Sequence, residues 1–139
     1  MKMINPFSTE YRAGLKVKSL LIHLSTQHRI NNKLARLIIK IVSEKVEVQF
    51  WENKNYIAPI SIKSIPEFFG GEYDELIIVK VDAYLRELAL KYEAVLTELN
   101  VTFYDNDGEI GAHVFVGKKF KATIPTLELL SKFYVPKKD

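Results

Sequence analysis

The three histidines are the side chains of this sequence best suited to acid–base, phosphoryl-transfer or metal chemistry. They are His23, His28 and His113, and no two of them have the spacing that a metal site on one helix or strand requires. The chain has no cysteine, which excludes thiolate ligands, thiol nucleophiles and disulfides. No set of acid, base and nucleophile converges, so catalysis ranks last among the functions considered, and we expect neither a metal nor another cofactor.

Basic residues give the clearest binding signal. Four of them recur at steps of four, three and four residues, namely Arg29, Lys33, Arg36 and Lys40. This spacing would align them along one face of a helix. A second basic group lies near the C-terminus at Lys118, Lys119 and Lys121. The net charge of +3 is only mildly basic, so an acidic protein surface and a nucleic acid are both reasonable partners.

Apolar periodicity predicts the elements that must position these side chains. We expect a strand over 15–24, where apolar alternation gives way to a continuous apolar run. A helix over 34–42 should follow, capped by Asn31 or Asn32. Alternation predicts a strand over 46–50, and a turn leads to its hairpin partner over 56–62. Pro59 places that second arm at a sheet edge, because proline cannot donate to a ladder.

The second half of the chain follows a different order. The predicted helices cover 64–69, 83–99 and 127–134. The predicted strands cover 76–81, 101–104, 110–116 and 120–124. No internal repeat is visible in the residues. The elements together predict an antiparallel or mixed sheet with helices on one face.

The succession of elements expected between 15 and 100 resembles the HPr family, the histidine phosphocarrier proteins of the bacterial sugar phosphotransferase system. Lys63-Ser64-Ile65 is similar to the lysine-serine-isoleucine at the start of the family's short second helix. The resemblance implies an α+β fold, an HPr-like open-faced β-sandwich in the order β-α-β-β-α-β-α. It divides the chain into an N-terminal segment (1–14), the HPr-like domain (15–100) and a C-terminal β-rich extension (101–139) packed on that domain.

The acceptor histidine of the family is where the sequence departs from the resemblance. In register, Asn31 takes the position of that histidine and Lys33 that of the following arginine. An amide cannot accept a phosphoryl group, so the resemblance implies a degenerate member. A shifted gap would bring His28 into place at the cost of burying polar residues, and an active phosphocarrier remains an alternative. Ser64 matches a position that a regulatory kinase phosphorylates in some members, or it is simply a helix cap.

These observations favour a non-catalytic binding or regulatory module that docks an acidic protein partner. The expected binding residues are Arg29, Asn31, Lys33, Arg36 and Lys40. The alternative of another class is a nucleic-acid-binding domain, in which the C-terminal lysines contact phosphates and Phe120 stacks on a base. No signal peptide or membrane-spanning run is visible, so we expect a cytoplasmic location and no membrane partner. The oligomeric state stays open, a homodimer included.

Overall fold

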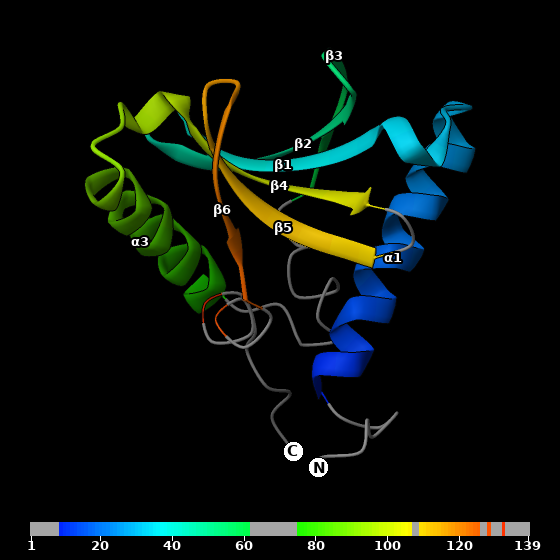
Figure 1. Cartoon of the computed structure of the whole chain (residues 1–139), viewed down its shortest axis with the longest axis horizontal. Helices are drawn as coiled ribbons and strands as arrows, with labels where there is room; N and C mark the ends of the chain where they lie inside the picture. The colour runs from blue at the N-terminus through cyan, green and yellow to red at the C-terminus, as the bar shows by residue number, and fades with distance from the viewer. Residues whose placement is uncertain (1–8, 62–74, 107–108, 126–127, 129–131, 133–139) are drawn as a thin grey trace.

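The computed structural model describes residues 9–61, 75–106, 109–125, 128 and 132. Its centre is a six-stranded antiparallel sheet in the order β3-β2-β1-β4-β5-β6. The strands are β1 (Ala35–Val42), β2 (Lys45–Glu52), β3 (Asn55–Ile60), β4 (Leu99–Asn106), β5 (Glu109–Val116) and β6 (Lys119–Ile124). The helices are α1 (Thr9–His28) and α3 (Glu75–Lys91), with short 3-10 helices η1 (Asn32–Leu34) and η2 (Leu96–Glu98). Both long helices lie on one side of the sheet (Figure 1).

Three of the predicted elements have the wrong structure. The strand expected over 15–24 lies inside α1, and the helix expected over 34–42 is strand β1. The strand at 76–81 and most of the helix at 83–99 form one helix, α3, which ends at Lys91. The apolar runs at these places fit either period, and the packing against the sheet decides which one is adopted.

The HPr-like fold is therefore wrong. The chain enters the sheet through a helix and three consecutive strands, and β4, β5 and β6 belong to the same sheet as β1. The predicted strands at 46–50, 56–62, 101–104, 110–116 and 120–124 are confirmed to within a few residues. Pro59 does lie on an edge strand. The helix predicted at 64–69 lies outside the described residues, as does most of the one at 127–134.

The described structure consists of two similar units, each a helix, a 3-10 helix and three strands. The strands of the second unit begin 64 positions after those of the first: Ala35 and Leu99, Lys45 and Glu109, Asn55 and Lys119. The hydrogen bonds repeat as well. The Asn53 amide donates to the Leu34 carbonyl at 2.7 Å, and the Gly117 amide donates to the Glu98 carbonyl at 2.8 Å. A structural repeat is thus present although none is visible in the sequence.

The repeat escapes detection because its two copies share almost no residues. When 29–60 is set against 93–124, only three pairs are identical: Lys54 and Lys118, Ala58 and Ala122, Ile60 and Ile124. What the copies share is the alternation that places apolar side chains on the buried face of each strand. Apolar patterning without residue identity is enough to specify the same fold twice.

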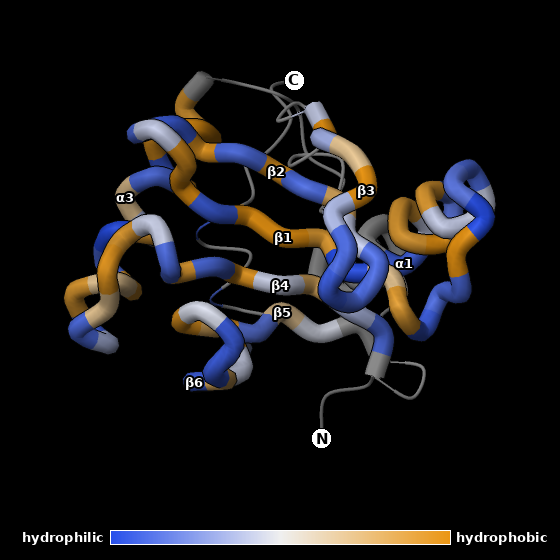
Figure 2. Tube along the Cα trace, turned by 90° about the horizontal axis from the view of Figure 1, so that it is seen from above, coloured by the Kyte–Doolittle hydropathy of each residue, from blue (hydrophilic) through white to orange (hydrophobic). Residues whose placement is uncertain are grey.

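Pairing of β1 with β4 joins the two units at the middle of the sheet, where Leu37 lies opposite Phe103 and Lys40 opposite Asn100. Helix α1 packs against β1 and β5, and α3 packs against β4 and β2, so each helix bridges both units. The helices cover the sheet face that carries the largest buried side chains of the strands, namely Leu37, Ile39, Ile41, Phe50, Leu99 and Phe103. Figure 2 shows β2, β1, β4 and β5 side by side between the two helices.

Within the described part of the chain, no helix has the length and apolar character that crossing a membrane requires.

Candidate functional site

The sheet face opposite the helices carries a hollow with a volume of about 730 Å³. Its floor comes from alternate positions of the two central strands: Arg36, Ile38 and Lys40 on β1, and Asn100, Thr102 and Tyr104 on β4. The turns of the β2–β3 and β5–β6 hairpins rise above this floor (Figure 1). We call this hollow the groove; it runs across the join between the two units.

Aromatic rings stand on both walls of the groove. Trp51 on β2 and Phe115 on β5 line it directly. Each ring has an aromatic neighbour on the adjoining edge strand: Tyr56 lies 5.6 Å from Trp51 and Phe120 lies 5.9 Å from Phe115, in edge-to-face pairs. Tyr56 is 50% exposed and Phe120 is 55% exposed. The walls therefore present ring surface to solvent that folding alone does not bury.

The groove is positively charged. The cations that line it are Arg36, Lys40, Lys54 and Lys118, against the single carboxylate of Glu98. None of these four cations forms an ion pair with another described residue. Glu47 lies opposite Lys40 on the neighbouring strand but is hydrogen-bonded to Gln49 at 3.3 Å. The cations are therefore available to an anion from outside the chain.

Tyr104 lies at the centre of a stack that crosses three strands. Strand β4, which carries it, is flanked by β1 and β5. The guanidinium carbon of Arg36 is 4.5 Å from the Tyr104 ring centroid, a cation–π distance. On the β5 side the imidazole of His113 has its centroid 4.6 Å from that of Tyr104. The Arg36 guanidinium also donates to the carbonyls of Lys33 (2.8 Å) and Ala35 (3.0 Å), which fixes its position.

Burial governs the electrostatics of this stack. Desolvation lowers the pKa of Arg36, although the nearby Tyr104 opposes the shift. Desolvation likewise lowers the pKa of His113, which favours the neutral imidazole. The Nδ1 atom of His113 lies 3.0 Å from the hydroxyl of Thr123, while its buried Nε2 has no hydrogen-bond partner. An additional positive charge is therefore costly at His113.

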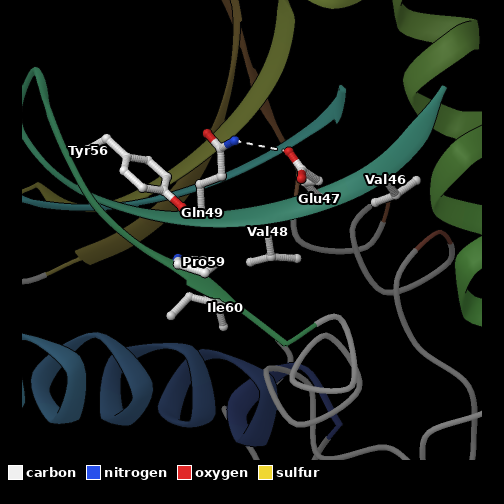
Figure 3. Close-up of a pocket in the computed structure, with 7 residues that line it drawn as sticks. All are labelled: Val46, Glu47, Val48, Gln49, Tyr56, Pro59 and Ile60. Atoms are coloured by element: carbon white, nitrogen blue, oxygen red, sulfur yellow. Dashed lines mark hydrogen bonds between the residues drawn. The ribbon is translucent and has the colours of Figure 1, made fainter. Parts of the chain in front are cut away.

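A second, smaller hollow of about 140 Å³ lies beside edge strand β3. Figure 3 shows Glu47, Gln49 and Tyr56 around it, with Pro59 and Ile60 from the edge strand. Its amide and carboxylate, Gln49 and Glu47, hydrogen-bond to one another. We therefore consider the groove the better candidate for ligand binding.

The structure separates the residues predicted to form one basic helix face. Arg36 and Lys40 lie on strand β1 and both line the groove. Arg29 is exposed after the end of α1 with a φ of 57°, and Lys33 is exposed in η1. Asn31 caps η1, where its side chain accepts a hydrogen bond from the Lys33 amide at 2.9 Å. The predicted basic helix face is wrong, because 35–42 is a strand.

The candidate phosphoryl carrier, His28, lies in the last turn of α1. Its ring is partly buried, with the centroid 5.5 Å from that of Phe50. His23 is exposed on the same helix. Ser64 lies outside the described residues. Both histidines lie in α1 well after its first turn.

Of the second basic group (Lys118, Lys119 and Lys121), only one lysine lines the groove. Lys118 lines it, whereas Lys119 and Lys121 are exposed on edge strand β6. Sequence reasoning missed most other residues of the walls and floor, among them Trp51, Lys54, Tyr104 and Phe115. Strand alternation was the signal that could have found them, because it puts Trp51 on the same face as Gln49, and Phe115 on the same face as His113.

No group of three or more His, Asp or Glu side chains suited to a metal ion occurs in the described ranges. Comparison of the chain with protein family models, with curated proteins and with solved structures found no match.

Proposed function

We propose that the protein binds single-stranded nucleic acid in the groove on the helix-free face of its sheet. The observation that supports this most directly is one hollow lined both by cations without an ion-pair partner in the described residues and by two partly buried rings, Trp51 and Phe115. Proteins that bind single strands combine these two features, a basic surface that follows the phosphates and rings on which bases stack.

The rings distinguish a single strand from other anions. In a duplex the bases are stacked on one another, so their faces are not free to contact Trp51 or Phe115. Stacking on an aromatic side chain contributes about 1–3 kcal/mol per base and tolerates any sequence. An acidic peptide would satisfy the cations alone and leave the rings without a matching partner. Because the same cations would bind either ligand, the rings are the feature that favours a nucleic acid over an acidic peptide.

The cations contribute a part of the binding free energy that depends on the salt concentration. Arg36 and Lys40 lie on the floor, with Lys54 and Lys118 on the two turns, so a strand crossing the groove passes all four. Each phosphate contact to a single strand contributes about −0.7 to the slope of log affinity against log salt concentration. Four contacts predict a slope of about −3.

Fluorescence anisotropy of a labelled oligothymidylate, measured over a range of salt concentrations, tests the proposal. Binding with a slope of about −3 is expected, with much weaker binding of a duplex of similar length. Lys40→Gln should weaken binding and reduce the slope by about 0.7. Lys18→Gln is the matched control, because Lys18 is an exposed lysine on α1. Absence of binding at low salt, or equal losses in both variants, would overturn the proposal.

An acidic peptide is the decisive competitor. Poly-glutamate that displaces the oligonucleotide at matched charge and length would show that the rings contribute nothing. The groove would then be a site for acidic protein segments, and the nucleic-acid proposal would be wrong.

A further inference from the structure

The two turns that rise above the groove carry the same kinds of side chain. Trp51 corresponds to Phe115, Tyr56 to Phe120 and Lys54 to Lys118 under the 64-residue repeat. Between 29–60 and 93–124 the first two pairs are the only positions that are aromatic in both units, and Lys54 is one of only three identical residues. Elsewhere in the groove the units have diverged.

The floor illustrates this divergence. Arg36 corresponds to Asn100, and Lys40 corresponds to Tyr104. These four residues occupy matching positions in one hollow, yet their chemical types have changed. The two turns carry the same types of side chain, whereas nearly all the other corresponding positions differ.

Backbone geometry at the two turns is also the same. Each hairpin has an irregular register directly before its groove ring, between Phe50 and Trp51 and between Val114 and Phe115. Asn53 and Gly117 take corresponding left-handed conformations, with φ of 51° and 60°. The amides of these two residues are tied to corresponding 3-10 helices, as described above. Both tips are thus held in the same way relative to the sheet.

Hairpin stability explains only part of this likeness. Trp51 lies opposite Tyr56 and Phe115 lies opposite Phe120, and cross-strand aromatic pairs stabilise a hairpin. That effect needs neither a lysine at each turn nor rings that stay half exposed. A cation beside an exposed ring is what a nucleotide requires, since it provides one contact for the phosphate and one for the base.

We infer that the two turns are equivalent nucleotide subsites, each taking one unpaired base against its ring pair and the adjoining phosphate on its lysine. This inference rests on the proposed function and defines how a strand is bound. Trp51 on β2 and Phe115 on β5 are separated by three strand spacings of about 4.8 Å across the sheet and by four residues of about 3.3 Å along the strands. The two residues therefore lie about 20 Å apart. A strand that rises about 3.4 Å per nucleotide, as in B-form DNA, bridges the tips with about six nucleotides, and a more extended strand needs fewer.

Trp51 is the only tryptophan of the chain and so reports on its own subsite. The double variant Trp51→Phe with Phe115→Trp moves that reporter to the other tip while both tips stay aromatic. Titration with oligothymidylates of about 3 and about 12 nucleotides should quench both reporters. The longer strand should bind once per chain and more tightly, because it occupies both subsites at once.

Lysine variants provide a measurement that does not depend on the rings. Lys54 and Lys118 are exposed, so Lys54→Gln and Lys118→Gln should leave the melting temperature unchanged. Each should reduce the salt slope for the longer strand by about 0.7. Trp51→Ala and Phe115→Ala should each weaken its binding by about 5- to 150-fold.

The outcomes separate the inference from the proposed function. Quenching at Trp51 with no response from a tryptophan at position 115, while anisotropy still shows binding, would overturn the equivalence of the subsites alone. So would a loss confined to one lysine variant. If no oligonucleotide binds in the anisotropy measurement, the proposed function fails and the inference fails with it.

Discussion

The ring of Tyr104 lies between Arg36 on one neighbouring strand and His113 on the other, 4.5 Å from the guanidinium carbon and 4.6 Å from the imidazole centroid. Burial of the His113 imidazole, whose Nε2 has no hydrogen-bond partner among the described residues, disfavours protonation of the ring. His113 is also flanked by uncharged groups, Thr123 and Phe120, which cannot compensate an additional charge. This arrangement makes the stability of the fold depend on pH.

We predict that the free energy of unfolding decreases as the solution becomes acidic. Burial lowers the pKa of His113 in the folded state below the ordinary value of 6.5, so the unfolded chain takes up the proton first. The contribution of His113 is fully present above the ordinary pKa and is lost as the pH falls through the folded value. Urea unfolding at a series of pH values measures it.

Two variants isolate this contribution. His113→Gln should flatten the pH dependence between neutral and mildly acidic solution, because the titrating group is gone. His23→Gln should leave it unchanged, because His23 is exposed on α1. A pH profile of His113→Gln that coincides with that of the unaltered protein contradicts the prediction.

Gly111 allows His113 to pack closely on β5. A Cβ atom at position 111 would lie 2.9 Å from Nε2 and 3.2 Å from Cε1 of His113. Gly111→Ala should therefore destabilise the protein by about 1–3 kcal/mol in thermal or urea unfolding. In a His113→Ala background the same change should cost far less, since the obstructing ring is absent. Additive costs in this double-mutant cycle would show that the imidazole is not the obstacle.

The left-handed backbone conformation of the two groove turns predicts which substitutions Gly117 tolerates. Gly117 has a φ of 60°, and a Cβ atom at this position would meet nothing within 4 Å, so any cost there comes from the backbone alone. Gly117→Asn should be nearly neutral, because asparagine already occupies the corresponding left-handed position at Asn53. Gly117→Val should cost about 1–2 kcal/mol.

Lys119→Val is the control for this comparison, because Lys119 is exposed and begins a strand, where valine is favourable. Its melting temperature should differ little from that of the original chain. If Gly117→Asn and Gly117→Val destabilise equally, steric effects rather than the backbone conformation govern the turn.

The central strands should carry most of the stability. Leu37 on β1 is fully buried at the join between the units, and Leu37→Ala should reduce the unfolding free energy by about 2–5 kcal/mol. Leu90 on α3 is 83% exposed, so Leu90→Ala should change it by no more than about 0.5 kcal/mol. Comparable losses in the two variants would mean that the join does not lie in the stable core.

Hairpins could be predicted from the sequence, because turn residues and strict alternation act locally. Lys45–Glu52 and Lys119–Ile124 were found in this way. The element Ala35–Val42 was not, because its apolar positions fit both a helical stripe and an alternating strand. Its β-branched residues, Ile38, Ile39, Ile41 and Val42, were the evidence for a strand.

The groove was predictable only in part. When a strand is mistaken for a helix, every side chain in that segment is assigned to the wrong face. A helix over 29–40 would align four cations on one face. Because 35–42 is instead strand β1, Arg36 and Lys40 lie beside residues of β4 and β2. The two aromatic walls come together only through a pairing between strands far apart in the chain, that of β1 with β4, such as Lys40 with Asn100. Nothing local in the sequence specifies that β1 and β4 become neighbours.

The pairing of β1 with β4 has a consequence for how the molecule comes apart. Removing either half would expose the backbone donors and acceptors of the paired segment, 37–40 or 100–103, together with the apolar face that both helices cover. A half-length fragment would leave that edge to water or pair it with a second fragment. The chain should accordingly melt in a single cooperative step, with neither half surviving as a separate intermediate.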